Sequence, residues 1–331
     1  MNTTIAKDLK IVFLGTPDFA THILRRIVDE GYNVVAAVTM PDKPAGRGHK
    51  LHPSSVKAYA VEQGLPVLQP ERLKDEAFLS ELRALGADLF IVVAFRMLPK
   101  EVWGMPHRGT FNLHASLLPK YRGAAPIQHA ILNGETVTGV TTFFLDEQID
   151  TGQVLMRREV GLTSQETGGS LHDKLMTTGA DLVVETIELI RNNEVVPSTP
   201  QPEMYEDEAS LPQAPKIFKE DRLLRFSSCT AVEVDRRIRA MSPYPSAIAT
   251  WHMVDGTDIE VKVFDAELLP HDTSLSAGQM KATKEGLLVG TTKGAILLKT
   301  IQMPSKRPIR HATWQMASTF PPWRKSSDLP S

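Results

Sequence analysis

Residues 10–39, KIVFLGTPDFATHILRRIVDEGYNVVAAVT, predict the fold class of this protein. Residues 10–15 are a short apolar run of the kind found in buried strands, and residues 19–31 place apolar side chains at helical spacing. Residues 32–39 are again typical of a strand. Strands that alternate with helices over such short distances favour a parallel sheet that helices cover on both faces. We therefore expect an α/β fold.

The alternation of strands and helices continues for another hundred residues and then changes. After residue 134, two strands are expected to follow each other without a helix between them. A long apolar periodicity of helical spacing comes next. The predicted segments are a helix at residues 55–64, buried strands at residues 88–95 and 109–114, consecutive strands at residues 137–146 and 152–160, and a long helix at residues 171–190.

The last third of the chain predicts a second domain. Residues 197–216 are rich in proline and acidic residues, lack periodicity and are typical of a connecting segment. Five or six short strands with glycine-containing turns follow, and Thr230 and Glu233 predict a capping box at the start of one helix. Such a pattern favours a small antiparallel barrel. We expect a first domain at residues 8–196 and a barrel domain at residues 217–323.

Composition limits the class of protein. The 331 residues, 42% hydrophobic and 23% charged, suffice for two globular domains. The single cysteine, Cys229, excludes an internal disulfide and a CxxC metal site and favours a reducing cytoplasm. The first ten residues lack the apolar core of a secretory signal, and the longest apolar run is too short to span a membrane. We expect a cytoplasmic protein with no metal centre and no membrane partner.

Charge is divided unevenly along the chain, whose formal net charge is −2. From Ala209 to the C-terminus, 17 lysines and arginines face 12 aspartates and glutamates, so this part is positive and the remainder is negative. The asymmetry favours an anionic partner for the basic part, although two solvated surfaces could differ by this much through chance alone.

The turn after the first strand, GTPDFA (residues 15–20), argues against a dinucleotide site. Such a site needs three glycines at fixed offsets and an acidic residue at the end of the second strand. Here one glycine is followed by Thr and Pro, and the second strand ends in VTM. Gly15 more simply permits a tight turn, and Asp18 suits the positive end of a helix. The sequence therefore disfavours a nicotinamide dehydrogenase.

The stretch FNLHASLLPKYRG (residues 111–123) carries the side chains best suited to catalysis. Asn112 and His114 are two residues apart, so a strand projects both on one face, near its carboxyl end. A histidine can take up a proton near neutral pH, and an amide NH₂ can stabilise a developing oxyanion. Asp146 and Asp150 lie in a turn where a carboxylate could orient the imidazole. Structural roles for Asn and His, and an acidic turn with only local hydrogen bonds, are the alternatives.

FNLHASLLPKYRGAAPIQ (residues 111–128) together with IDTG (residues 149–152) resembles the 10-formyltetrahydrofolate-dependent formyltransferases. IVFLGTPDFA, PDKPAGRGHKL and IRAMSPYPSA (residues 11–20, 41–51 and 238–247) extend this resemblance over nearly the whole chain, to those members that formylate methionyl-tRNA. It implies a Rossmann-like formyltransferase domain followed by a small OB-like β-barrel that binds tRNA. It also implies transfer of the formyl group of 10-formyltetrahydrofolate to the amino group of methionyl initiator tRNA, for translation initiation. We expect a monomer.

The resemblance also implies roles for individual residues. Asn112, His114 and Asp150 match the catalytic trio of the family. Asn112 would hold the tetrahedral oxygen, and His114 would help to remove the ammonium proton. Asp150 would order His114 and a nearby water. The residues expected at the folate site are Phe95, Met97, Ser116, Leu117, Leu118, Pro119 and Asp146.

The loop at residues 41–51 is expected to reach the acceptor end of the tRNA. Proline and glycine give it a defined but adaptable path, and Lys43, Arg47 and Lys50 suit phosphates, although a solvated surface loop is the alternative. The run AFRMLP departs from the A-Y-G-x-I-L-P often seen in the family, with Arg96 in place of a glycine, so the pterin pocket is expected to differ in detail. A formyltransferase for a small amine, such as a sugar-nucleotide amine or glycinamide ribotide, and a non-catalytic tRNA-binding module are the competing hypotheses.

Overall fold

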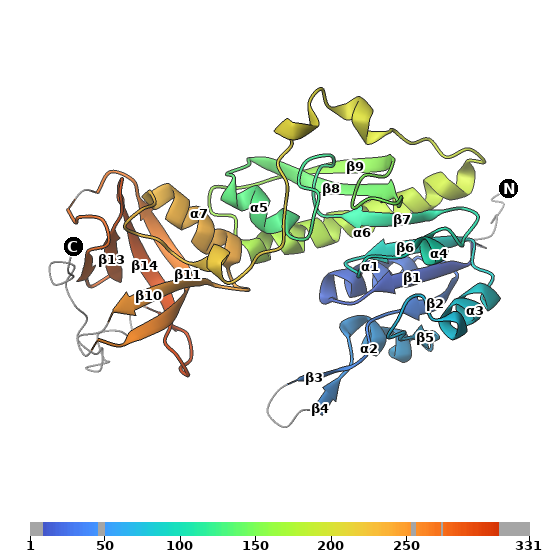
Figure 1. The fold of residues 1–331 in the computed structure, drawn as a ribbon, viewed down its shortest axis with the longest axis horizontal. Coiled ribbons are helices and arrows are strands. Elements are labelled where there is room, and N and C mark those ends of the chain that lie inside the picture. Colours follow the sequence, from blue (N-terminus) through green and yellow to red (C-terminus); the bar gives the residue numbers. More distant parts are fainter. Residues whose placement is uncertain (1–8, 46–49, 253–255, 273, 311–331) are drawn as a thin grey trace. The chain divides into compact units, whose positions relative to one another are not determined.

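The computed structural model describes residues 9–45, 50–252, 256–272 and 274–310 (Figure 1). It divides into two compact units. The first unit holds most residues up to Ala214, and the second holds the residues from Pro215 onward together with residues 127–136 and 162–171. The expected boundaries at residues 196 and 217 stay a prediction.

The first unit is built on a seven-stranded sheet in the order β5-β2-β1-β6-β7-β8-β9. Its first five strands are parallel, and β8 and β9 are antiparallel to their neighbours. The predicted parallel-rich sheet and the consecutive strands after residue 134 are thereby confirmed. The strands are β1 (Ile11–Gly15), β2 (Val34–Val38), β5 (Val67–Leu68), β6 (Leu89–Val93), β7 (Thr110–His114), β8 (Val137–Phe144) and β9 (Val154–Gly161).

Helices cover this sheet, and a short hairpin follows β2. Val12, Phe90 and Val92 pack with α3 and α4 on one face, whereas α6 packs against the other face at Leu113. Ser54 begins α2 by accepting a hydrogen bond from the Lys57 N–H. The helices are α1 (Asp18–Asp29), α2 (Ser55–Glu62), α3 (Glu76–Ala84), α4 (Lys100–Trp103), α5 (Pro126–Leu132) and α6 (Gly168–Asn192), and the hairpin strands are β3 (Lys43–Ala45) and β4 (Lys50–His52).

Gly15 is required where β1 turns into α1. A Cβ atom on this residue would lie 2.6 Å from Cβ of Ala20 and 3.1 Å from the carbonyl oxygen of Val93. Glycine therefore lets the helix approach the sheet closely, which is the turn-forming role expected from the sequence.

The segment at residues 197–216 does more than connect the two units. It contains the short 3₁₀ helices η1 (Gln201–Met204) and η2 (Glu208–Ser210), and most of it belongs to the first unit. Thr199 forms a bridge with Val154, and the Tyr121 N–H donates to the carbonyl oxygen of Pro212 at 2.6 Å. The sequence pattern did not predict these contacts, because main-chain hydrogen bonds leave no trace in side-chain periodicity.

The second unit is an antiparallel sheet of six strands with the order β10-β11-β14-β13-β12, in which β15 pairs with β14. Helix α7 (Ala231–Met241) packs on it through Val234, Ile238 and Met241, and the predicted capping box of Thr230 and Glu233 is confirmed. This arrangement is an OB-like half-barrel. A third short 3₁₀ helix, η3 (Glu220–Arg222), leads into it. The strands are β10 (Ala247–His252), β11 (Asp258–Leu269), β12 (Met280–Ala282), β13 (Leu287–Gly290), β14 (Ala295–Gln302) and β15 (Ile309–Arg310).

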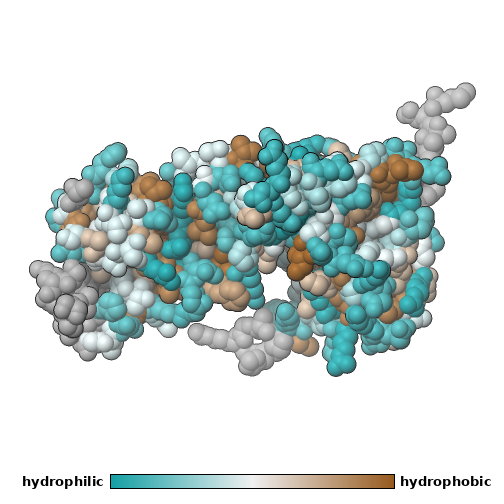
Figure 2. Space-filling view, turned by 45° about the horizontal axis from the view of Figure 1, so that its top comes forward, coloured by the Kyte–Doolittle hydropathy of each residue, from teal (hydrophilic) through white to brown (hydrophobic). Residues whose placement is uncertain are grey.

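The surface is largely polar on the face drawn in Figure 2, where hydrophobic residues lie in small separate groups. Within the described ranges, no helix combines the length and the hydrophobicity that a membrane span requires.

Candidate active site

Strand β7 presents Asn112 and His114 on one face of the first unit's sheet. Asn112 pairs in register with Val92, so both side chains lie on the face covered by α3 and α4. Leu113 points to the opposite face, where a Cβ atom on Gly179 of α6 would lie 2.7 Å from its side chain. The predicted alternation along this strand is confirmed.

His114 is buried, and a backbone carbonyl orients its ring. Its Nε2 lies 2.8 Å from the carbonyl oxygen of Tyr121. A carbonyl oxygen can only accept, so Nε2 carries the hydrogen in the neutral ring and Nδ1 keeps the lone pair. The ring of Phe143 meets the imidazole edge-on, with the centroids 6.5 Å apart. Nδ1 is thus the ring atom able to take up a proton.

Asp150 approaches that nitrogen from the turn between β8 and β9. Its Oδ2 lies 3.8 Å from Nδ1 of His114 and accepts a hydrogen bond of 2.9 Å from the Gly123 N–H. At 3.8 Å the carboxylate and the imidazole make no direct hydrogen bond, but an N–H or O–H group of a third molecule can bond to both. Asp150 also has a φ of +56°, in the left-handed region that residues other than glycine rarely adopt.

Gln201 holds this turn, although no motif in the sequence marks it. Its Nε2 donates to the carbonyl oxygens of Asp150 and Gly152, at 2.9 Å each, and its Oε1 accepts from Nε and Nη2 of Arg122 at 3.0 and 2.8 Å. Nη1 of Arg122 reaches Glu208 at 2.6 Å. Gln201 lies in a segment without periodicity, so only the folded chain identifies it.

Within the described part of the chain, two buried side-chain oxygens near the carboxyl edge of the sheet have no hydrogen-bond partner, namely Thr16 Oγ1 and Asn112 Oδ1. Thr16 follows β1, and β1 and β7 flank β6 in the sheet. An unpaired buried polar atom costs about 1–3 kcal/mol, so such atoms are rare unless a ligand satisfies them. In open α/β sheets, ligands bind at this edge. The two unpaired atoms therefore favour a polar ligand here.

The segment at residues 116–119, expected at the folate site, is fixed by internal hydrogen bonds. Ser116 Oγ donates to the carbonyl oxygen of Lys120 at 2.7 Å, and the Leu118 N–H donates to Thr141 Oγ1 at 3.1 Å. Thr141 Oγ1 in turn donates to the carbonyl oxygen of Ser116 at 2.6 Å. These bonds fix the backbone of residues 116–119 next to His114. A direct contact of this segment with folate stays a prediction.

Arg96, which follows β6, folds back on the loop between β5 and α3. Its guanidinium donates to the carbonyl oxygens of Pro70 and Glu71, the latter at 2.8 Å, and burial lowers its pKa. Of its neighbours, Phe95 packs against the α3–α4 core and Met97 is 71% exposed. The arginine thus anchors the loop that follows β6.

The remaining residues are Asp146, which is expected at the folate site, and three basic residues that are expected to contact the tRNA. Asp146 is exposed and accepts a hydrogen bond of 2.8 Å from Thr151 Oγ1, which is the local contact of an acidic turn. Lys43 is exposed in β3. Arg47 and the side chain of Lys50 fall outside the described residues. Binding of folate or tRNA by these residues stays a prediction.

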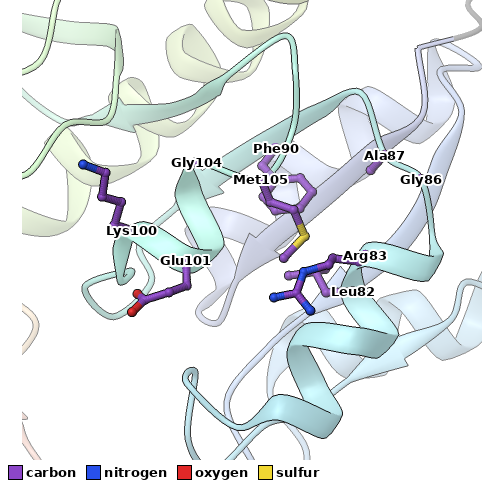
Figure 3. Close-up of a pocket in the computed structure, with 9 residues that line it drawn as sticks. All are labelled: Leu82, Arg83, Gly86, Ala87, Phe90, Lys100, Glu101, Gly104 and Met105. Carbon is purple, nitrogen blue, oxygen red and sulfur yellow. The ribbon is translucent and has the colours of Figure 1, made fainter.

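A cavity of 470 Å³ lies elsewhere on the first unit, between α3 and α4 (Figure 3). Arg83 and Leu82 border it from α3, and Met105 and Phe90 lie on the other side. Asn112, His114 and Asp150, the expected catalytic residues, do not line this cavity. Among the described residues, no group of three or more His, Cys, Asp or Glu could hold a metal ion.

Both parts of the chain match known families. Residues 9–187 match the formyl transferase family, and residues 216–318 match the formyl transferase C-terminal domain. The chain is 49% identical to the methionyl-tRNA formyltransferase of Parabacteroides distasonis over 303 residues, which covers 91% of this chain and 93% of that protein. It is 45% identical to the methionyl-tRNA formyltransferase of Flavobacterium johnsoniae over 316 residues, which covers 95% and 98%.

Solved structures share the fold at low sequence identity. HypX from Aquifex aeolicus in complex with tetrahydrofolic acid superposes with a TM-score of 0.63 at 19% identity, covering 95% of this chain and 48% of that one. WlaRD, a sugar 3N-formyl transferase, superposes with a TM-score of 0.62 at 18% identity, covering 90% and 99%. At such identities the similarity shows the fold alone.

Proposed function

Because the chain belongs to the formyl transferase family, we propose that it transfers the formyl group of 10-formyltetrahydrofolate to the amino group of methionyl initiator tRNA, for translation initiation. One observation carries the proposal: relatives named methionyl-tRNA formyltransferase match both units of the chain at 45–49% identity. The geometry around His114 supports it.

His114 is the proton acceptor in the proposed mechanism. Its Nδ1 has the free lone pair, because Nε2–H is bonded to the carbonyl oxygen of Tyr121. The ammonium group of the methionyl-tRNA, placed between Nδ1 and Asp150 Oδ2, can donate to both, since these atoms are 3.8 Å apart. After one proton has passed to Nδ1, the neutral amine attacks the formyl carbon. The bond from that carbon to the folate nitrogen then breaks, and the folate nitrogen takes the second proton that the amine gives up. Asp150 then stabilises the imidazolium that forms, as a carboxylate does in the hydrolytic triads. General base catalysis of this kind typically contributes about 10²–10⁴ in rate.

Asn112 is the proposed donor to the formyl oxygen as that oxygen gains negative charge. Its amide shares a strand face with His114, and its Oδ1 has no partner among the described residues. Turning the amide over would point its NH₂ where the unpaired oxygen lies, toward the substrate. One such donor is worth about 10²–10³ in turnover.

The two unpaired buried oxygens at the carboxyl edge of the sheet support the proposal that the folate binds there as a polar ligand. The unpaired oxygen of Thr16 and the amide of Asn112 would gain partners, and residues 116–119 would border the ligand beside the trio. When bound, 10-formyltetrahydrofolate supplies the electrophilic formyl carbon. No metal ion is part of the proposal.

The second unit provides a proposed tRNA-binding surface. A groove of 340 Å³ on this unit is lined by Lys219, Arg222, Tyr244 and Lys262 among others, and Tyr244 is 83% exposed. Arg222 fixes the tyrosine loop by donating to the carbonyl oxygens of Pro245 and Ser246. Cations around an exposed aromatic ring suit phosphates and an unpaired base.

The remaining expectations form part of the same proposal. Lys43, Arg47 and Lys50 are proposed to contact the acceptor end of the tRNA. A charged initiator tRNA as substrate agrees with a cytoplasmic location, and we propose a monomer.

The experiment that tests this function is a formylation assay with the purified protein and 10-formyltetrahydrofolate. Methionyl-tRNA charged on initiator and on elongator species would be compared, with a sugar-nucleotide amine and glycinamide ribotide as small acceptors. We expect formylation of the initiator species in clear excess over all others. Equal formylation of both tRNAs, transfer to a small amine alone, or binding of tRNA without transfer would contradict the proposal.

A further inference from the structure

We propose that Gln201 and Arg122 are positioning residues for formyl transfer. Together they hold Asp150 and the loop at residues 121–123 at fixed positions relative to His114. The inference rests on the proposed function, because it takes His114 and Asp150 as the reacting pair. It assigns a part of the active site to a segment whose sequence is typical of a connector.

Gln201 is fully buried, and its amide uses its whole hydrogen-bonding capacity. The NH₂ donates twice, to the carbonyl oxygens of Asp150 and Gly152, and the amide oxygen accepts twice from Arg122. Turning the amide over would place its oxygen against two carbonyl oxygens and its NH₂ against a guanidinium. The four contacts thus fix a single orientation of the side chain.

Asp150 needs such support because its backbone is strained. A residue other than glycine at a φ of +56° persists only where its surroundings hold it. The turn has no room on the β8 side, since a Cβ atom on Gly152 would lie 1.7 Å from the carbonyl oxygen of Phe144. If the two donors of Gln201 are lost, the turn can relax only away from β8. The carboxylate would then move relative to His114.

Arg122 connects the turn to the imidazole. It lies between Tyr121, whose carbonyl oxygen orients Nε2 of His114, and Gly123, whose N–H holds Asp150. The arginine is 8% exposed, and its guanidinium is bound by Gln201 and Glu208. The two hydrogen bonds that orient the proposed reacting groups therefore both come from the residues next to Arg122.

The kinetic test uses Gln201→Met, which keeps the length of the side chain and removes both polar groups. We expect kcat for methionyl-tRNA to fall by about 10–100-fold while KM for the folate changes by less than about threefold. Gln201→Glu retains the acceptor for Arg122 but cannot donate to the turn, and it should lose a similar factor. Ile27→Ala, a fully buried change in α1, is the control for lost stability and should keep kcat.

Coupling to Asp150 distinguishes positioning from a general structural role. Once Asp150→Ala has removed the carboxylate, adding Gln201→Met should lower kcat by less than about twofold further. The inference would be overturned if the fold-losses in kcat of the two single variants multiplied in the double variant. A KM for folate that rises by as large a factor as kcat falls would also overturn it.

Amide hydrogen exchange at Gly123 gives a readout that does not need activity. Because this N–H donates to Asp150 Oδ2, Gln201→Met and Asp150→Ala should both reduce its protection by tenfold or more, and Ile27→Ala should reduce it far less. Unchanged protection in Gln201→Met would disprove the positioning role. If the wild-type protein forms no formylmethionyl-tRNA, the proposed function fails, and the exchange result still decides whether Gln201 holds Asp150.

Discussion

At the scale of single residues, the site depends on which imidazole nitrogen is free. The carbonyl oxygen of Tyr121 takes the Nε2 hydrogen of His114, so Nδ1 faces Asp150 with its lone pair. The same two groups without the carbonyl would leave the tautomer undetermined. One backbone oxygen thus decides which ring atom can accept a proton.

The role of His114 can be separated from its packing with two substitutions. His114→Gln keeps an N–H donor near the carbonyl oxygen of Tyr121 but has no base, whereas His114→Ala loses both. We expect kcat to fall by about 10²–10⁴ in each variant. The free energy of unfolding should drop by about 1 kcal/mol more in the alanine variant, as urea denaturation would measure. A loss of activity that only follows the loss of stability would indicate a structural histidine.

At the scale of elements, α7 is fixed at both ends by charged side chains. Its start has the capping box of Thr230 and Glu233, in which hydrogen bonds from Thr230 lower the pKa of Glu233. Nearer its end, Asp235 binds Arg239 at 2.8 Å, and Arg239 also donates to the carbonyl oxygen of Glu166 at 3.0 Å. The arginine therefore joins α7 to the residues just before α6.

Removing Arg239 should make the stability of the protein depend on pH. Burial raises the pKa of Asp235, while Arg239 opposes this shift through its charge and its hydrogen bond. In Arg239→Met the pKa should rise further, with only the charge of Arg236 still opposing the shift, so that a buried carboxylate without its hydrogen-bonded partner destabilises the fold at high pH. We expect a loss of about 3 kcal/mol in the free energy of unfolding at pH 8.

The sign of this effect follows from the raised pKa. A carboxyl group with a higher pKa in the folded state contributes stability at low pH and loses it as pH rises through that pKa. The deficit of Arg239→Met should therefore shrink as pH is lowered from 8 to 5, in urea unfolding curves at each pH. A deficit that grows as pH falls would show that the carboxylate is not the destabilising group.

At the scale of the whole molecule, the net charge differs between the two parts of the sequence. The part from Ala209 onward carries the excess of lysine and arginine, and the groove with Lys219, Tyr244 and Lys262 lies within it. Glu260 neutralises Lys219 in this groove through an ion pair of 2.5 Å. Lys262 is therefore the clearest candidate for a phosphate contact.

Salt dependence offers a measurement of that contact. Lys262→Ala should raise KM for methionyl-tRNA at moderate salt and reduce the slope of log KM against log salt by about 1, because one fewer counterion is released. KM for the folate should not change. Lys284→Ala, an exposed lysine in the turn between β12 and β13, is the matched control. Equal effects of both substitutions would mean that only the overall charge matters.

The fold was more predictable than the site. Periodicity identified β1, α1, β2, β6, β7 and the capping box, because each depends on side chains close in sequence. The shared face of Asn112 and His114 followed from strand alternation alone. Gln201 could not be predicted in this way, because its four hydrogen bonds join segments 49 to 79 residues apart.

The sequence by itself determined the α/β architecture, the second domain and the residue types suited to formyl transfer, since hydrophobic pattern and motif spacing are local properties. Only the tertiary structure decided which nitrogen of His114 is free, how far Asp150 lies from it, and that Gln201 joins the turn of Asp150 to Arg122. The physical reason is that a hydrogen bond depends on distance and direction in space, and these are set only when distant segments pack together.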